Sequence, residues 1–157
     1  ISSISRIDSL DWQITRSASG DFQLLNMPKD KELEYGSILN SIVSSLTSLD
    51  FEQLLAVDEV TADENFAQSL KVLTQLEVST TEYKLFQVVV SELDDKQFVN
   101  FSSYGESEYW QNWYYQISNF SAQQLIKTLD DFLAEDKTTT SNSDARPQTI
   151  EEGDSPN

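Results

Sequence analysis

The feature that most constrains the fold is a change in the spacing of apolar residues near the middle of the chain. Apolar side chains first recur every three or four positions, which predicts an amphipathic helix from Lys31 to Leu49. From Val72 to Ile117 the spacing becomes two, in runs separated by polar turn residues. Between the two patterns, residues 51–57 fit either a strand or a helical extension, and residues 58–65 predict a loop. The period of two predicts a β-meander with strands at residues 72–78, 83–91, 97–102 and 112–117.

Shorter patterns flank these two. Apolar and polar residues alternate between residues 11 and 24 around a turn that contains Gly20, which predicts a β-hairpin. Helical spacing returns in residues 118–135, where Ser121 and Gln124 stand in the positions of a capping box. A second amphipathic helix is therefore expected after the meander.

Together these elements predict an α+β fold, with a mainly antiparallel sheet of about five to seven strands and the two amphipathic helices packed on one face. Leu46 and Leu129, one from each helical stripe, are expected to be buried. Residues 1–135 are predicted to form a single domain. Residues 136–157 are polar and acidic, and we predict a disordered tail there because they offer too little apolar surface to bury.

Charge and composition exclude several classes of function. The chain has 27 acidic and 10 basic residues, for a net charge of −17, so it has no basic surface with which to bind nucleic acid. Histidine and cysteine are both absent, which excludes Ser-His-Asp and Cys-His catalysis and zinc sites built from these ligands. No apolar run approaches the ~18 residues of a membrane span. The acidity favours solubility, or attraction to a basic protein partner.

A dense aromatic and acidic stretch follows the third meander strand and is the candidate binding site. Its rings either cover the sheet or are exposed to a partner, and a glycan is a second class of ligand that such rings bind. No catalytic, cofactor-binding or metal-binding residue is assigned. The candidate partner-binding residues are Tyr104, Glu106, Glu108, Tyr109, Trp110 and Trp113.

Three stretches resemble a bacterial envelope family of unknown function, often encoded beside gliding-motility-type ABC transporters. The first is the hairpin with Trp12, Ile14 and Arg16, and the second is the helix that ends in Ser45 to Leu49. The third runs from the strand Trp113 to Ile117 into the final helix with Leu129 to Leu133. The resemblance implies an extracytoplasmic, membrane-tethered accessory domain.

The resulting functional expectation is a non-enzymatic, envelope-facing binding or scaffolding module, in the setting of a transporter complex. The alternative is a carboxylate-based hydrolase that acts on a glycan, because adjacent acids such as Asp94 and Asp95 could supply an acid–base pair. The chain opens at Ile1 without methionine and lacks cysteine. We therefore expect a periplasmic or extracytoplasmic location, with an anchor upstream of Ile1.

Overall fold

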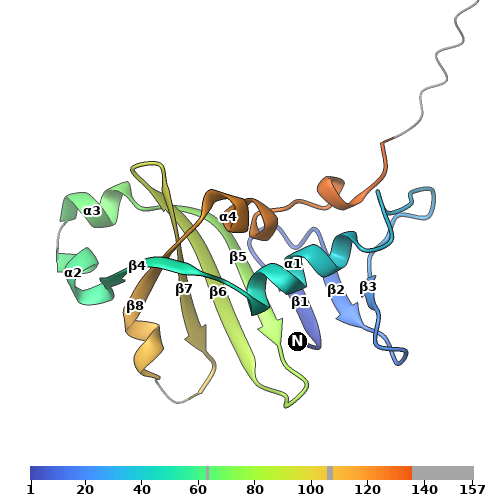
Figure 1. Ribbon diagram of the computed structural model, residues 1–157, viewed down its shortest axis with the longest axis horizontal. Coiled ribbons are helices and arrows are strands. Elements are labelled where there is room, and N and C mark those ends of the chain that lie inside the picture. The colour runs from blue at the N-terminus through green and yellow to red at the C-terminus, as the bar shows by residue number, and fades with distance from the viewer. Residues whose placement is uncertain (63, 106–107, 136–157) are drawn as a thin grey trace, which may run out of the picture.

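The computed structural model describes residues 1–62, 64–105 and 108–135, and the predicted tail at residues 136–157 lies outside them. The described chain forms one eight-stranded antiparallel sheet in the order β3-β2-β1-β5-β6-β7-β8-β4 (Figure 1). The strands are β1 (Ser3–Arg6), β2 (Gln13–Arg16), β3 (Phe22–Leu24), β4 (Phe51–Ala56), β5 (Lys71–Ser79), β6 (Leu85–Leu93), β7 (Lys96–Ser103) and β8 (Trp113–Ile117).

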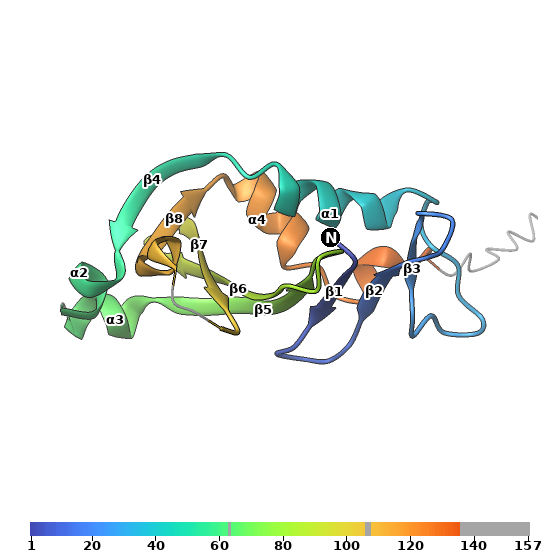
Figure 2. The same cartoon turned by 90° about the horizontal axis from the view of Figure 1, so that it is seen from below.

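The helices confirm the predicted α+β class. Figure 2 shows α1 and α4 on the same side of the sheet, with β4 arching from the end of α1 towards α2 and α3. None of the helices in the described residues is long and apolar enough to cross a membrane. The helices are α1 (Ile38–Thr47), α2 (Val57–Ala62), α3 (Glu64–Ser69) and α4 (Asn119–Leu125), with 3-10 turns η1 (Tyr109–Asn112) and η2 (Asp130–Phe132).

The predicted meander is confirmed in β5 to β8, which pair consecutively. The turn between β6 and β7 is formed by Asp94 and Asp95, whose φ angles are 48° and 60°. Aspartate tolerates this left-handed conformation, which a two-residue hairpin turn requires. The sheet exceeds the expected strand number because β1 and β4 join it. Ile4 of β1 lies opposite both Ile14 and Val78, so β1 connects the N-terminal hairpin to the meander.

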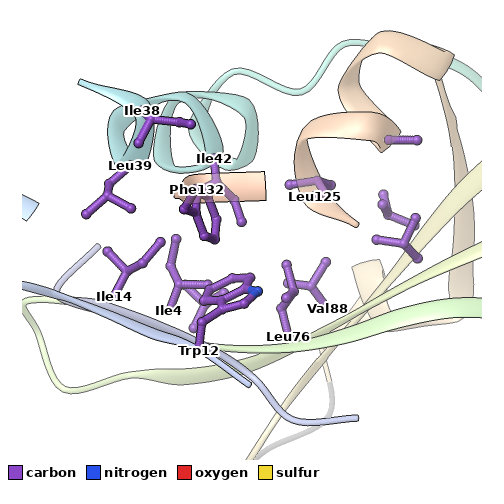
Figure 3. Close-up of a cluster of buried hydrophobic side chains, with 14 of the residues drawn as sticks. Ile4, Trp12, Ile14, Ile38, Leu39, Ile42, Leu76, Val88, Leu125 and Phe132 are labelled. Atoms are coloured by element: carbon purple, nitrogen blue, oxygen red, sulfur yellow. The ribbon is translucent and has the colours of Figure 1, made fainter. Parts of the chain in front are cut away.

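The core lies between the sheet and the two main helices (Figure 3). The rings of Trp12 and Phe132 meet edge to face, with 5.3 Å between their centroids. Leu46 and Leu129 are half-buried against this core instead of fully buried. The fully buried side chains include Ile4, Ile14, Ile38, Leu39, Ile42, Leu76, Val90, Val99, Ile117 and Leu125.

The first helix begins seven residues later than predicted, at Ile38. Upstream of it, Leu33 forms a bridge with Leu133, and the Glu34 amide donates to the carbonyl of Phe132 at 2.9 Å. Tyr35, which fits the helical stripe by spacing, is 49% exposed. Backbone groups that hydrogen bond to a distant segment do not follow local helical propensity, so tertiary contacts outweigh the pattern here.

The segment after α1 also differs from prediction. Residues 51–57, which fit either a strand or a helix, form β4 up to Ala56. Residues 58–65, predicted as a loop, lie mainly in the short helices α2 and α3. Acidic residues in the first turn of each helix interact favourably with the helix dipole. The loop prediction counted these residues only as polar and overlooked that they favour the start of a helix.

The predicted C-terminal helix is broken. α4 ends at Leu125, and its N-cap is Ser118 rather than Ser121, because the Ser118 hydroxyl accepts from the Ser121 amide at 3.1 Å. The following residues form a strap over the sheet that ends in η2. The Leu129 amide donates to Asp11 at 3.2 Å, and the Lys127 carbonyl accepts from the Trp12 indole at 2.8 Å. These long-range bonds replace the bonds that would have continued the helix.

Arg6 anchors this strap to the sheet. Its side chain is only 11% exposed, lies 3.1 Å from Asp8 and 3.8 Å from Asp11, and donates to the Lys127 carbonyl at 3.2 Å. Burial by itself would raise the pKa of Asp8. Hydrogen bonds from Arg6, the Gln75 amide and Thr74 outweigh burial and hold that pKa below its usual value.

A smaller buried set lies on the opposite face of the sheet from the main core. It includes Ser91, Leu93 and Phe98, and the Ser91 hydroxyl has no hydrogen-bond partner among the described residues. An unsatisfied buried hydroxyl costs free energy, so Ser91→Ala is expected to leave stability unchanged or raise it by up to about 1 kcal/mol. Urea unfolding measures this change.

Ser118→Ala is the matched control, because the Ser118 hydroxyl accepts a hydrogen bond from the Ser121 amide. Loss of the N-cap bond is expected to lower the free energy of unfolding by about 1 kcal/mol. If Ser91→Ala were as destabilising as Ser118→Ala, the Ser91 hydroxyl would have to be hydrogen-bonded in the folded protein.

Candidate functional site

Five aromatic side chains surround an open groove of about 300 Å³, which we call the aromatic groove. They come from five separate segments, the four strands β4, β6, β7 and β8 and the turn η1. The groove residues are Phe51, Phe86, Phe101, Trp110 and Tyr115.

Strand register explains why these rings share one side of the sheet. Phe101 lies opposite Val88, and Tyr115 lies opposite Val99. Directly opposed residues point to the same face, and both valines are buried in the core beneath the helices. The aromatic groove is thus the part of the core-bearing face that α1 and α4 leave uncovered. Figure 2 shows β7 and β8, which carry two of these rings, beside the two helices and under the arch of β4.

The rings contact one another at distances typical of aromatic pairs. Tyr115 is central, with centroids 4.7 Å from Phe51 and 5.6 Å from Phe101. Trp110 closes the other end, 5.8 Å from Phe86 and 6.4 Å from Phe101. Each ring is oriented by its neighbours, so the groove exists before any ligand enters.

Hydrogen bonds hold the η1 turn in place. The Asn100 amide of β7 donates to the carbonyls of Gln111 at 3.1 Å and Trp113 at 2.9 Å. The Tyr115 hydroxyl donates to the carbonyl of Trp110 at 3.0 Å. Burial, and to a smaller extent the nearby Tyr109, raises the pKa of Tyr115, so this phenol remains a donor at neutral pH. Trp110 is therefore presented by a fixed turn.

A more polar pocket of about 400 Å³ adjoins the aromatic groove and shares Phe86 and Trp110 with it. Tyr104 and Glu108 lie on its wall, as does Lys84. The Lys84 ammonium lies 3.7 Å from Glu82, and both side chains are largely exposed. Charged groups thus border the apolar surface at its β6 end.

The sequence-predicted site residues are only partly brought together. Trp110 lies in the aromatic groove, and Tyr104 and Glu108 line the adjoining pocket. Tyr109 is 79% exposed and lines neither. Trp113 is half-buried in β8 and also lines neither, while Glu106 lies outside the described residues.

Four of the five groove residues are absent from the candidate residues named from the sequence, namely Phe51, Phe86, Phe101 and Tyr115. Phe86 lies two positions before Val88 in β6, so both side chains point to the same face of the sheet. This spacing in the sequence was a signal that Phe86 faces the core side. Phe51 gave no such signal because its segment was ambiguous between strand and helix. No local pattern could show that these distant rings meet.

The carboxylates of the described residues give little support to a metal site or to acid catalysis. Within residues 1–62, 64–105 and 108–135 no group of three ligating side chains is placed to hold a metal ion. Asp8 and Asp131 have lowered pKa values; for Asp131 the main cause is the Thr128 amide, which donates to it at 2.7 Å. A general acid needs a raised pKa. These two carboxyls therefore do not favour the glycan hydrolase.

Comparison of the chain with protein-family models, with curated proteins and with solved structures gives no match. The family resemblance based on the hairpin, the first helix and the last strand accordingly stays a prediction.

Proposed function

We propose that this chain is a non-enzymatic binding module that takes apolar side chains of a protein partner into the aromatic groove. The observation that carries the proposal is the convergence of five rings on an open groove in the sheet face that also carries the core. Buried rings normally lie under a helix or loop, and an open aromatic patch of this kind marks an interaction site. Aromatic anchors also dominate the energy of many interfaces.

The chemistry of the groove favours a polypeptide over a glycan. All five lining residues are aromatic, and the hydroxyl of Tyr115 already donates to the Trp110 carbonyl. A sugar must satisfy its own hydroxyl groups, whereas an apolar side chain needs only area and shape. The net charge of −17 adds a preference for a basic partner, since complementary charge speeds encounter and suppresses acidic competitors.

The envelope setting belongs to the same proposal. An extracytoplasmic accessory of a transporter complex would use such a module to hold a protein partner. Support for this setting comes from the absence of cysteine and from the family resemblance, both of which are features of the sequence.

A defined peptide tests the binding function. The probe is a short, end-capped peptide of alternating lysine and phenylalanine, and the quantity measured is its Kd by isothermal titration calorimetry. We expect Phe51→Ala and Trp110→Ala each to weaken binding about tenfold or more, because each removes an aromatic anchor. Trp110 fluorescence should also change when the wild-type groove is filled.

The matched control is Phe120→Ala, which removes an exposed ring (74%) that lines neither the aromatic groove nor the adjoining pocket. This variant should bind the probe as the wild type does. A peptide of alternating lysine and serine controls for charge alone and should bind far more weakly. Equal affinity for the two peptides, or binding of a chitin oligosaccharide to the groove in their place, would contradict the proposal.

A further inference from the structure

The strand β4 lies at one end of the sheet with one side unpaired. Among the residues that the structure describes, only β8 pairs with it, from Phe51 opposite Ile117 to Ala56 opposite Trp113. In an antiparallel strand every second residue directs its N–H and C=O away from its partner. The outer side of β4 therefore presents a row of backbone groups that a further strand could pair with.

β4 carries a bulge and one charged residue, Glu52, but lacks other devices that protect an edge strand. Its six residues contain no lysine and no proline, and four of them are exposed. A bulge lies near its start, between Phe51 and Gln53, and leaves the register regular from Gln53 onward. A strand edge of this kind is suited to pair with another chain.

The free edge and the aromatic groove are continuous. Phe51 belongs to both, and Leu54 lies opposite Tyr115, so its side chain is on the groove side of β4. Phe51 is 47% exposed and Leu54 is 50% exposed. A strand laid along β4 would place alternate side chains against these two residues and towards the groove.

Charge identifies the occupant. Residues 32–70, which contain β4, have no lysine or arginine, and Asp50, Glu52, Asp58 and Glu59 flank or belong to the strand. A second copy would bring another net charge of −17 to the same edge, and residues 136–157 carry five acidic and two basic residues. The acidic edge would repel a second copy and the chain's own residues 136–157, whereas it would attract a basic segment. The acidic residues of this segment are Glu32, Glu34, Asp50, Glu52, Asp58, Glu59, Asp63 and Glu64.

We infer that an extended basic segment of a partner protein adds to β4 as a ninth strand and points its alternate apolar side chains into the aromatic groove. This inference rests on the proposed function, and it specifies how the partner is held. Backbone hydrogen bonds to β4 supply one part of the affinity, and the aromatic rings supply the other.

The test uses the lysine–phenylalanine peptide and two N-methylated versions of it. One version carries methyl groups on the amides of the lysines, and the other on the amides of the phenylalanines. A bound strand directs only one of these two sets of amides towards β4. We expect one version to bind about tenfold or more weakly than the parent peptide, and the other to bind within about threefold of it.

Amide hydrogen exchange provides the second readout. The backbone amides of β4 that face outward should exchange more slowly when the parent peptide is bound, with no comparable change in β3 at the opposite edge. Equal affinities of the two methylated peptides, or unchanged exchange in β4, would overturn strand addition. If the parent peptide still required Phe51 and Trp110, the groove function would survive that result.

The remaining outcomes also decide the inference. Failure of the parent peptide to bind at all would overturn the binding function itself. A dimer in sedimentation experiments that protects the β4 amides without peptide would show that a second copy occupies the edge. Protection that disappears when residues 138–157 are removed would assign the edge to the chain's own tail. Either of the last two results would overturn the assignment to a partner protein.

Discussion

Replacing Phe132 with alanine is expected to lower the free energy of unfolding by about 3–5 kcal/mol. Phe132 is fully buried and meets Trp12 edge to face. It belongs to η2, at the end of the strap that follows α4, so its loss removes the fully buried side chain of η2 from the core. Urea unfolding followed by tryptophan fluorescence measures the change, because Trp12 lies in the affected contact.

Phe120→Ala serves as the matched control for the same residue type in the same part of the chain. Phe120 is 74% exposed in α4, and its removal should change stability by no more than about 0.5 kcal/mol. Similar effects of the two substitutions would contradict the placement of the strap in the core.

Arg6→Ala is expected to cost about 2–3 kcal/mol at neutral pH. The substitution leaves the carboxylates of Asp8 and Asp11 without their cation and removes a donor to the Lys127 carbonyl. Breaking a fully buried pair costs more, but the Asp8 side chain is 26% exposed and water screens part of the interaction. Chemical unfolding of the variant and the wild type measures the difference.

The ion pair of Arg6 and Asp8 should also make the free energy of unfolding fall at acid pH. The pKa of Asp8 is lowered in the folded protein, so its contribution is complete above the unfolded value of about 3.9 and is lost as the pH falls through the folded value. The difference between Arg6→Ala and the wild type should therefore shrink below about pH 4. A difference independent of pH would show that Arg6 acts through packing and its hydrogen bond to the Lys127 carbonyl, and not through the carboxylates.

Lys84→Ala is the control for this prediction. Lys84 lies 3.7 Å from Glu82, but the two side chains are 66% and 77% exposed. An exposed pair contributes little, so this substitution should change stability by less than about 0.5 kcal/mol at any pH.

Some of the fold was readable from local sequence. The strands β5 to β8 and the N-terminal hairpin follow from alternation of apolar and polar residues, because one face of each strand meets the core and the other does not. The lack of histidine and cysteine excludes catalysis and metal ligation by these side chains of the chain without any structure. Trp110, which lines the aromatic groove, was also picked out as a candidate from the sequence, since it stands in a dense run of aromatic residues.

Other elements depended on contacts between distant segments. Helical spacing continues upstream of Ile38, yet residues 32–34 pair with residues 132–134 and leave the helix. The same applies after Leu125, where Arg6, Asp11 and Trp12 hold the strap through its backbone. A backbone group forms whichever hydrogen bond gives the whole fold the lowest free energy. The periodicity of apolar residues indicates only whether a segment favours a helix or a strand by itself.

The sequence by itself therefore determined which residues alternate, which faces are apolar, and that the chain carries a strongly acidic net charge. Only the tertiary structure decided where an apolar face stays open. Phe86 and Phe101 carry the same alternation as the buried Val88 and Val99, yet both remain half-buried and line the open groove. Coverage by a helix depends on how distant segments pack, and no local pattern of residues encodes it.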